Sequence, residues 1–322
     1  MRLRLVQQGT NFDFFGRWKL WFGISGALMV LALVSFFFQG LNFGIDFRGG
    51  TTIRTESEQV IDIGEYRAAI STLGLGDVTI TEVFDPTFAA NQNVALIRIQ
   101  AQEGQESVTA AVVEATRAAL ASRIPDIRFV SVESVGPKVS GELIRKAVLA
   151  VLLAIGAVLI YIWLRFEWQF ALGAVAALIH DVILTIGIFS ELQIKFDLAI
   201  IAALLTIVGY SLNDTVVVFD RVRENLRKYK KKPLAEVLNI SINETLSRTL
   251  MTSVTTLLAL IALFVLGGDV IRGFVFAMIW GVVVGTYSSV FVAASILLYL
   301  GVKRDWSKPT DTTGNQFANV DA

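Results

Sequence analysis

The sequence predicts an α-helical membrane protein with six transmembrane helices and one small α+β domain outside the bilayer. Three observations lead to this fold class. Hydrophobic residues make up 54% of the 322 residues, which is too apolar for an ordinary soluble protein. Six apolar runs have about the length that crosses a hydrocarbon core of ~30 Å. Residues 39–140 contain no such run and carry more acidic than basic side chains.

Residues 20–38 form the first expected transmembrane helix. A signal peptide has an apolar core of about 7–15 residues and a small-residue cleavage site. This run is longer and continues into FFFQGLNFG, so we expect an uncleaved helix. Residues 1–19 carry an excess of basic side chains, which predicts a cytoplasmic N-terminus.

Residues 39–140 read as strands and helices in the order β-α-β-β-α-β. GGTTIRTES alternates like a strand, and residues 60–73 read as a helix that Gly74 and Gly76 end. VTITEVF and NVALIRIQ read as strands around a turn at Asp85-Pro86. A helix over residues 107–122 and the strand IRFVSVESV complete a ferredoxin-like α+β domain. Its scattered acids indicate a solvated surface, and a binding surface is the only function we expect of it.

Five further transmembrane helices follow this domain. We expect them over residues 141–164, 168–189, 198–219, 246–266 and 272–302. The loop 220–245 and the tail 303–322 are rich in basic residues. The short loops on the other side contain only two basic residues, Lys195 and Arg272. Because positive charge accumulates on the cytoplasmic side, both termini are expected inside and residues 39–140 outside. The basic run from Arg227 to Lys232 is explained as a topology signal near anionic lipid, without nucleic acid.

Asp214 is the one formal charge inside the expected helix 198–219. A carboxylate at that depth costs on the order of 2.5–3.5 kcal/mol on insertion scales, so it needs a partner or water. Tyr210 and Ser211 precede it by one turn and share its helix face, and Asn213 is the next polar neighbour. Two interpretations stand: a polar group that holds helices together, or a titratable carboxylate in an ion path.

Other polar and small residues mark the remaining helices. His180 and Asp181 lie near the middle of helix 168–189 and either relay protons or pack helices; adjacent helical residues need not touch each other. Small residues recur every four positions in the last helix and predict a close helix–helix contact. They are Gly273, Ala277, Gly281, Gly285, Ser289 and Ala293.

Several sequence motifs resemble the SecD/SecF family of bacterial protein-export membrane proteins. They are Asn42–Gly50 (NFGIDFRGG), Val135–Ser140 (VGPKVS), Gly209–Arg221 (GYSLNDTVVVFDR), Leu246–Thr249 with the threonines that follow, and Gly285–Ser289. The match runs in order over residues 20–302. One outer domain and six helices favour the SecF branch over the larger SecD branch.

The resemblance implies half of a resistance-nodulation-division (RND) type helix bundle in the bacterial inner membrane, with residues 39–140 in the periplasm. It implies SecD as a heterodimer partner, the SecYEG channel, YajC and YidC as further partners, and exported polypeptide as the cargo. Protons would be the coupling ion, with no other cofactor. Asp214 and Arg248 would occupy the proton pathway, and Thr252 would support it.

Two other functions remain open from the sequence. One is half of an RND-type antiporter for small molecules, and the other is a membrane chaperone or scaffold that transports nothing. An enzyme is not expected, because no phosphate-binding glycine loop and no nucleophile–base pair is visible. The chain has no cysteine and one histidine, which argues against a transition-metal enzyme. We expect no catalytic residue and no metal-binding residue.

Overall fold

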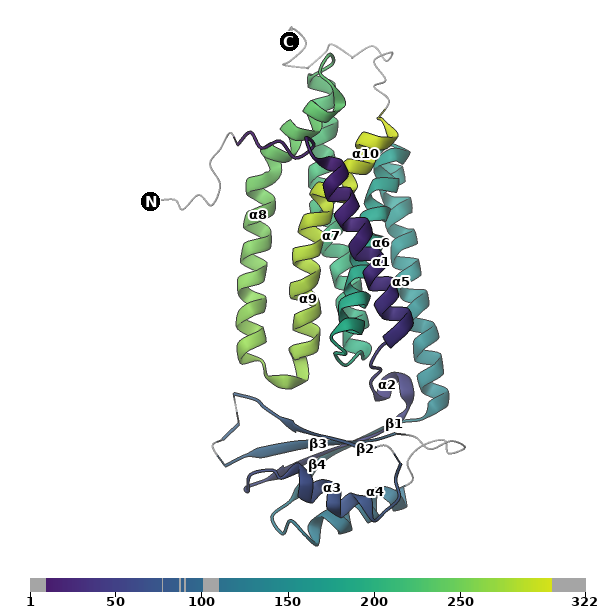
Figure 1. Ribbon diagram of the computed structural model, residues 1–322, viewed down its shortest axis with the longest axis vertical. Helices are drawn as coiled ribbons and strands as arrows, with labels where there is room; N and C mark the ends of the chain where they lie inside the picture. Colours follow the sequence, from purple (N-terminus) through teal and green to yellow (C-terminus); the bar gives the residue numbers. More distant parts are fainter. Residues whose placement is uncertain (1–9, 77, 87, 90, 101–109, 303–322) are drawn as a thin grey trace.

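Figure 1 shows a long helical bundle with the α+β domain attached at one end of it. The computed structural model describes residues 10–302 except 77, 87, 90 and 101–109. Six helical segments of the described chain are long and apolar enough to cross a membrane, which confirms the predicted fold class. They are α1 (Trp18–Gln39), α5 (Pro137–Arg165), α6 (Trp168–Glu191), α7 (Leu198–Lys228), α8 (Leu234–Leu266) and the run from α9 (Gly268–Ser288) through the π-helix η1 (Ser289–Ala293) to α10 (Ala294–Leu300).

The α+β domain has the predicted order of strands and helices. Its elements are β1 (Gly50–Ser57), α3 (Ile63–Ser71), β2 (Val78–Val83), β3 (Asn93–Gln100), α4 (Ala110–Ala121) and β4 (Arg128–Val135). The sheet order is β2-β3-β1-β4, and every neighbouring pair is antiparallel. Ile53, Ile97 and Leu120 are fully buried between the sheet and its two helices. Helix α3 begins later than expected because the Asp62 carboxylate accepts a hydrogen bond from the Gly64 N–H and caps it there.

The motif after α1 forms a junction between the bundle and the domain. Its short helix α2 (Ile45–Arg48) had not been expected from the sequence. The Gly44 N–H donates to the Phe196 carbonyl at 2.8 Å, and the Phe196 N–H donates to the Asn42 carbonyl at 2.8 Å. The Asp46 carboxylate accepts from the Leu198 N–H at the start of α7. The chain leaving α1 is therefore bonded to the α6–α7 turn before it enters the sheet.

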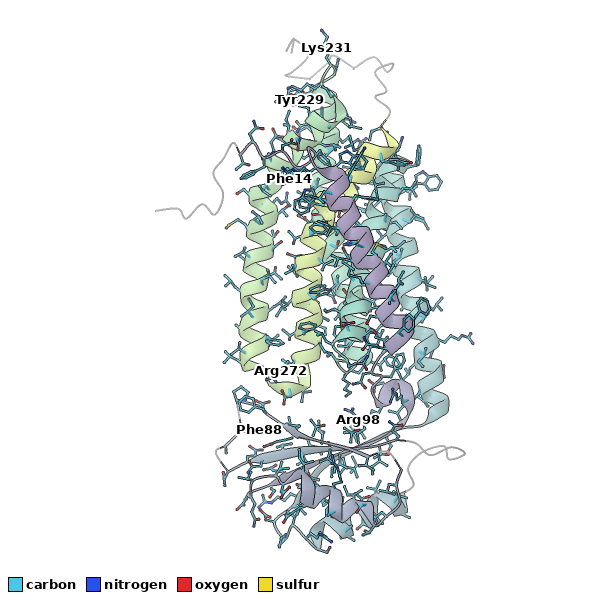
Figure 2. All side chains as sticks on the ribbon, in the orientation of Figure 1. Phe14, Phe88, Arg98, Tyr229, Lys231 and Arg272 are labelled. Atoms are coloured by element: carbon cyan, nitrogen blue, oxygen red, sulfur yellow. The ribbon has the colours of Figure 1, made fainter. Side chains whose placement is uncertain are left out.

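A second contact joins the far edge of the sheet to the bundle. The Phe84 N–H donates to the Asp269 carboxylate at 2.7 Å, and the Asp269 N–H donates back to the Phe84 carbonyl at 3.0 Å. Gly268 has a φ of +73° at this turn, and a Cβ there would lie 2.6 Å from an oxygen of Asp85. Figure 2 shows Arg272 near the start of α9, above Phe88 on the loop after β2. The β2–β3 loop thus rests against the α8–α9 turn.

The expected loop over residues 220–245 is mostly helical, which corrects the prediction. Helix α7 continues to Lys228 and α8 begins at Leu234, so only residues 229–233 connect them. Their apolar faces, Val222 and Leu226 against Val237 and Leu238, are buried together. The Asn225 amide also donates to Ser241 at 3.0 Å and to Glu244 at 2.6 Å. Hydropathy cannot detect such helical extensions because their exposed faces are charged.

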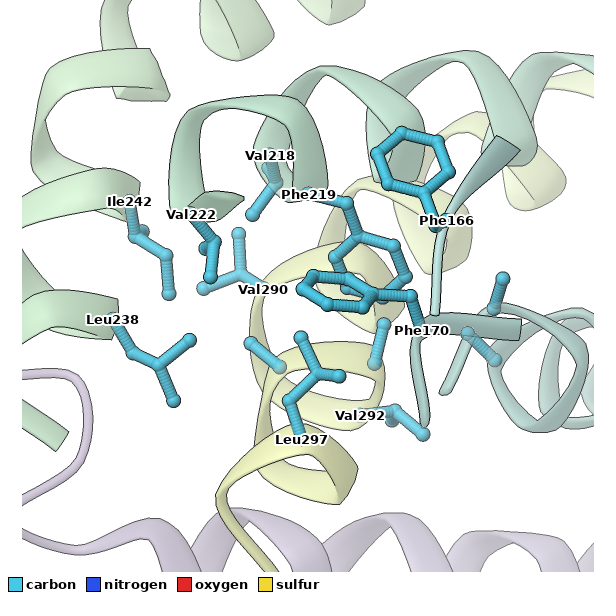
Figure 3. Close-up of a cluster of buried hydrophobic side chains, with 14 of the residues drawn as sticks. Phe166, Phe170, Val218, Phe219, Val222, Leu238, Ile242, Val290, Val292 and Leu297 are labelled. Atoms are coloured by element: carbon cyan, nitrogen blue, oxygen red, sulfur yellow. The ribbon is translucent and has the colours of Figure 1, made fainter. Parts of the chain in front are cut away.

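The last predicted helix, over 272–302, is also not uniform. It begins at Gly268 and changes to a π-helix at Ser289 before α10 completes it. Such π-helical turns are often found at functional sites. Figure 3 shows the buried cluster beside this turn, in which Phe170 and Phe219 contact edge to face at 5.1 Å. Val290 and Leu297 belong to the same cluster, which closes the bundle on the side away from the α+β domain.

Candidate functional site

Asp214 lies inside the bundle, where α7, α8 and η1 meet. Its side chain is only 9% exposed. The Thr249 hydroxyl donates to Oδ1 at 2.5 Å, and the Ser289 hydroxyl donates to Oδ2 at 2.5 Å. Among the residues that the structure describes, no cation lies within ion-pair distance of this carboxylate. Two neutral hydroxyl groups, one on each oxygen, therefore surround it.

The small-residue face of α9 brings these groups together. A Cβ added at Gly281 would lie 2.3 Å from a carbon of Ile207 on α7, and one at Gly285 would lie 3.0 Å from Ser211. At Gly273 the same atom would be in ordinary contact with Ile200 at 3.6 Å. Helices approach this closely only where side chains are absent. The close approach of α9 to α7 brings Ser289 within reach of Asp214.

Asp181 on α6 forms a second buried carboxyl site beside the first. It is 1% exposed. The Ser211 hydroxyl of α7 and the Ser288 hydroxyl of α9 donate to its Oδ2 at 2.6 and 2.8 Å. The Nδ1 atom of His180 lies 2.9 Å from Oδ1. Ser211 had been placed with Asp214 by helix position, but its hydroxyl faces α6 and bonds Asp181 instead.

His180 and Asp181 contact each other although they are adjacent on one helix. The imidazole stacks on Tyr287 with ring centroids 6.1 Å apart. The Tyr287 hydroxyl bonds to the Trp21 carbonyl at 3.0 Å and lies 2.9 Å from the Ser25 hydroxyl, both on α1. This stacking holds the ring so that Nδ1 faces Asp181. The Nε2 atom is buried without a hydrogen-bond partner in the described structure.

The other residues singled out from the sequence lie further from the carboxylates. Arg248 is exposed and forms no ion pair with Asp214 in the described structure. The Thr252 hydroxyl donates to backbone carbonyls of its own helix. Asn213 is exposed, and the half-buried Tyr210 has a hydroxyl without a partner in the described structure. None of these four side chains hydrogen-bonds either carboxylate.

Sequence reasoning missed Thr249 and Ser288 and gave Ser289 only a packing role. The available signal was the density of hydroxyl residues in SRTLMTS on α8 and in TYSS, which runs from α9 into η1. A hydroxyl group can both donate and accept, so it can bond a carboxylate or a carboxylic acid. The described residues contain no group of three or more histidines and acids that could hold a metal ion. Because hydroxyl groups both donate and accept, the arrangement can hydrogen-bond Asp214 in its ionised and in its protonated form.

Comparisons with known protein families agree with the sequence motifs. The family model described as "Protein export membrane protein SecD/SecF, C-terminal" matches residues 115–303. The "SecD/SecF GG Motif" model matches residues 34–59. Two similar relatives are each named "Protein translocase subunit SecF". The one from Cereibacter sphaeroides is 61% identical over 100% of this chain and 99% of its own length. The one from Rhodobacter capsulatus is 57% identical over 99% of this chain and 97% of its own.

Two solved structures are also similar. The crystal structure of SecDF from Thermus thermophilus, described as a translocon-associated membrane protein, has a TM-score of 0.81 and 36% sequence identity. A SecDF structure in a super-membrane-facing form has a TM-score of 0.68 and 37% identity. Each match covers 93% of this chain and 40% of the SecDF chain. The present chain therefore spans less than half of the SecDF polypeptide that it matches.

Proposed function

The chain belongs to the SecD/SecF family as a SecF-type subunit of the protein translocase, and we propose that it uses the proton-motive force to assist polypeptide translocation. Asp214 is the group that takes up and releases the coupling proton. A proton crossing ~100 mV releases about 2.3 kcal/mol, so a few protons can drive a substantial conformational step.

The observation that carries this proposal is the burial of Asp214 among hydroxyl groups alone. A permanent ion pair would hold the carboxylate in one charge state, because separating the charges in a low-dielectric interior is costly. Thr249 and Ser289 instead donate to the ionised form and can accept from the protonated form. Arg248 forms no ion pair with Asp214 in the described structure, and its positive charge acts on the carboxyl across a longer distance. Both protonation states of Asp214 therefore have satisfied hydrogen bonds.

The topology of the chain supports a link between proton uptake in the bundle and the exported polypeptide. With basic residues inside, both termini are cytoplasmic and the α+β domain is periplasmic, where the exported polypeptide emerges. Two direct contacts attach that domain to the helices, at the α6–α7 turn and at the α8–α9 turn. Since α7, α8 and the π-helix η1 that continues α9 surround Asp214, a shift of these helices on protonation would be transmitted to the domain.

The partners follow from the family and from the unmatched part of the SecDF chain. SecD supplies the other half of the bundle, since this chain matches 40% of the SecDF chain and the rest of that chain has no counterpart here. The outward faces of α5 and α8 are mostly exposed and are available to a partner helix or to lipid. The SecYEG channel, with YajC and YidC, completes the proposed assembly in the inner membrane.

Translocation of a secretory precursor into membrane vesicles, with and without an imposed proton gradient, tests the proposal. Asp214→Asn keeps the shape but removes the proton site, so gradient-dependent stimulation should be lost. Thr249→Val removes one hydrogen bond to a charged group, worth about 1.5–3 kcal/mol, and should reduce the stimulation. Arg248→Met should reduce it as well.

Thr215→Val is the matched control for Thr249→Val. The Thr215 hydroxyl is equally buried but donates only to the Ser211 carbonyl of its own helix at 3.0 Å. This variant should retain the stimulation. Transport driven by ATP through the channel should persist in all variants, because no nucleotide-binding motif is visible in this sequence. Full gradient-dependent stimulation with Asp214→Asn would contradict the proposal and leave Asp214 as a packing residue.

A further inference from the structure

The second buried carboxyl, Asp181, has no part in the function proposed above. It is the less exposed of the two carboxyls, and three polar groups from three helices converge on it. An ionised carboxylate in the interior of a membrane protein is costly and tends to mark a functional site. Packing alone does not explain why a histidine with an unsatisfied Nε2 atom is placed against it.

Consecutive residues connect the two carboxyl groups. Ser288 donates to Asp181 and Ser289 donates to Asp214. Because adjacent Cα atoms are about 3.8 Å apart, the two carboxyl groups lie on the order of 10 Å from each other. The two serines sit where α9 becomes the π-helix η1, so a single backbone segment contacts both sites.

Each serine hydroxyl has a second acceptor within reach. The Ser288 hydroxyl lies 3.1 Å from the Gly285 carbonyl, and the Ser289 hydroxyl lies 3.0 Å from the Thr286 carbonyl. When a carboxylate gains a proton, its new O–H can donate to the serine oxygen. The serine hydrogen then turns to the backbone carbonyl. After the proton has bound, every hydrogen-bond donor still has an acceptor. Each site therefore accommodates both the ionised and the protonated carboxyl.

We propose that Asp181, together with His180, is a second protonatable site, and that Ser288 and Ser289 couple its protonation to that of Asp214. This inference rests on the proposed function of Asp214 as a proton carrier. Each protonation step changes the hydrogen bonds of the same α9–η1 segment. A proton bound at one carboxyl therefore alters the hydrogen-bond geometry and the electric field at the other carboxyl.

The titratable surroundings of Asp181 are few. Residues 20–38 of α1 and 147–164 of α5 contain no acid, base or histidine. The titratable side chains on the elements that pack against α6 here are Tyr210 and Asp214 on α7, Tyr287 on α9, the exposed Tyr161 on α5 and the exposed Tyr299 on α10. On α6 itself the neighbour is His180. Asp214 is thus the one other carboxyl on these faces.

Infrared difference spectra of the complex of this chain with its SecD partner, in lipid vesicles at high and low pH, test the inference. A protonated carboxyl gives a distinct carbonyl stretching band. The two buried carboxyls should each contribute one band to the wild-type spectrum, so Asp214→Asn should remove one band and Asp181→Asn another. Removing either carboxyl should move the midpoint pH of the remaining band by about one unit, as expected for unit charges roughly 10 Å apart at an effective dielectric constant of about 20.

Three hydroxyl variants separate coupling from local effects. Ser288→Ala should shift the band of Asp181, which it contacts, and also the band of Asp214, which it does not contact. Thr185→Val is the control, because the Thr185 hydroxyl is buried on α6 and donates only to the Asp181 backbone carbonyl. It should change neither band. Ser211→Ala serves if Asp181→Asn fails to assemble, since it should shift the Asp181 band without removing it.

Identical spectra for the wild type and Asp181→Asn, or for the wild type and Ser211→Ala, would overturn the second site. If neither Asp181→Asn nor Ser288→Ala changes the Asp214 band or its midpoint pH, the proposed coupling would be overturned. Failure of the proposed function appears elsewhere, as undiminished gradient-dependent translocation in Asp214→Asn. The spectra and the translocation assay therefore report on the two proposals separately.

Discussion

Gly281→Ala should separate α9 from α7 and weaken both the fold and the site. The added methyl group would lie 2.3 and 2.4 Å from carbons of Ile207, whereas carbon atoms prefer about 3.5–4.0 Å. Ile207 is buried and β-branched, so it has little freedom to turn away. Either the helices part by about 1 Å or the side chain leaves its rotamer, at a cost of about 1–3 kcal/mol.

A displacement of that size would reach the carboxyl groups. The Ser289 hydroxyl bonds Asp214 at 2.5 Å, and an added ~1 Å would take it beyond good hydrogen-bond geometry. Gly273→Ala is the matched control on the same helix face, since its Cβ would be 3.6 Å from Ile200. Helix propensity favours alanine by about 1 kcal/mol at either position, so the control should be neutral or stabilising.

Thermal unfolding of the purified SecD-containing complex and gradient-dependent translocation measure the two effects. Gly281→Ala should lower the unfolding midpoint and the stimulation, and Gly273→Ala should lower neither. Equal stability and equal activity of the two variants would refute the close α7–α9 contact as the feature that positions Ser289.

Three further predictions concern the parts outside the bundle centre. The Asn239 amide holds the pKa of Asp13 below its usual value, so the carboxylate stabilises the native state above a pH of about 4 and loses this effect as the pH falls. Asp13→Asn should therefore lower the unfolding midpoint at pH 7, and the gap to the wild type should close at low pH; a gap independent of pH would disprove it. Asp269→Ala removes the acceptor of the Phe84 N–H and should speed hydrogen exchange of that amide at least about 10-fold, and an unchanged rate would show that the bond contributes nothing. A cysteine replacing Asn91 should react with a membrane-impermeant maleimide from the periplasmic side, and labelling only after the cells are opened would overturn the proposed topology.

Hydropathy and periodicity predicted the six helices and the order of elements in the α+β domain. This worked because a segment within the bilayer must satisfy its own backbone hydrogen bonds, so a long apolar run has few alternatives to a helix. The helical extension of residues 220–245 was not predicted, because its stability comes from contacts between two charged, amphipathic segments.

The candidate site was predicted only in its centre. Asp214 stood out because an acid is rare inside an apolar run. Its actual partners, Thr249 and Ser289, lie 35 and 75 residues away and belong to other helices. Helix position placed Ser211 beside Asp214. In the structure α7 is rotated so that the Ser211 hydroxyl faces α6 and donates to Asp181 instead. Interhelical rotation depends on packing, which a single sequence does not encode locally.

Proton entry into vesicles that contain this chain and its SecD partner tests the central claim most directly. A pH-sensitive dye inside the vesicles reports proton flux under an imposed membrane potential. The wild type and the buried-hydroxyl control Thr215→Val should conduct protons, and Asp214→Asn should reduce the flux to that of vesicles without the complex. Equal flux through the wild type and Asp214→Asn would contradict the claim that this carboxyl, with Thr249 and Ser289, carries the coupling proton.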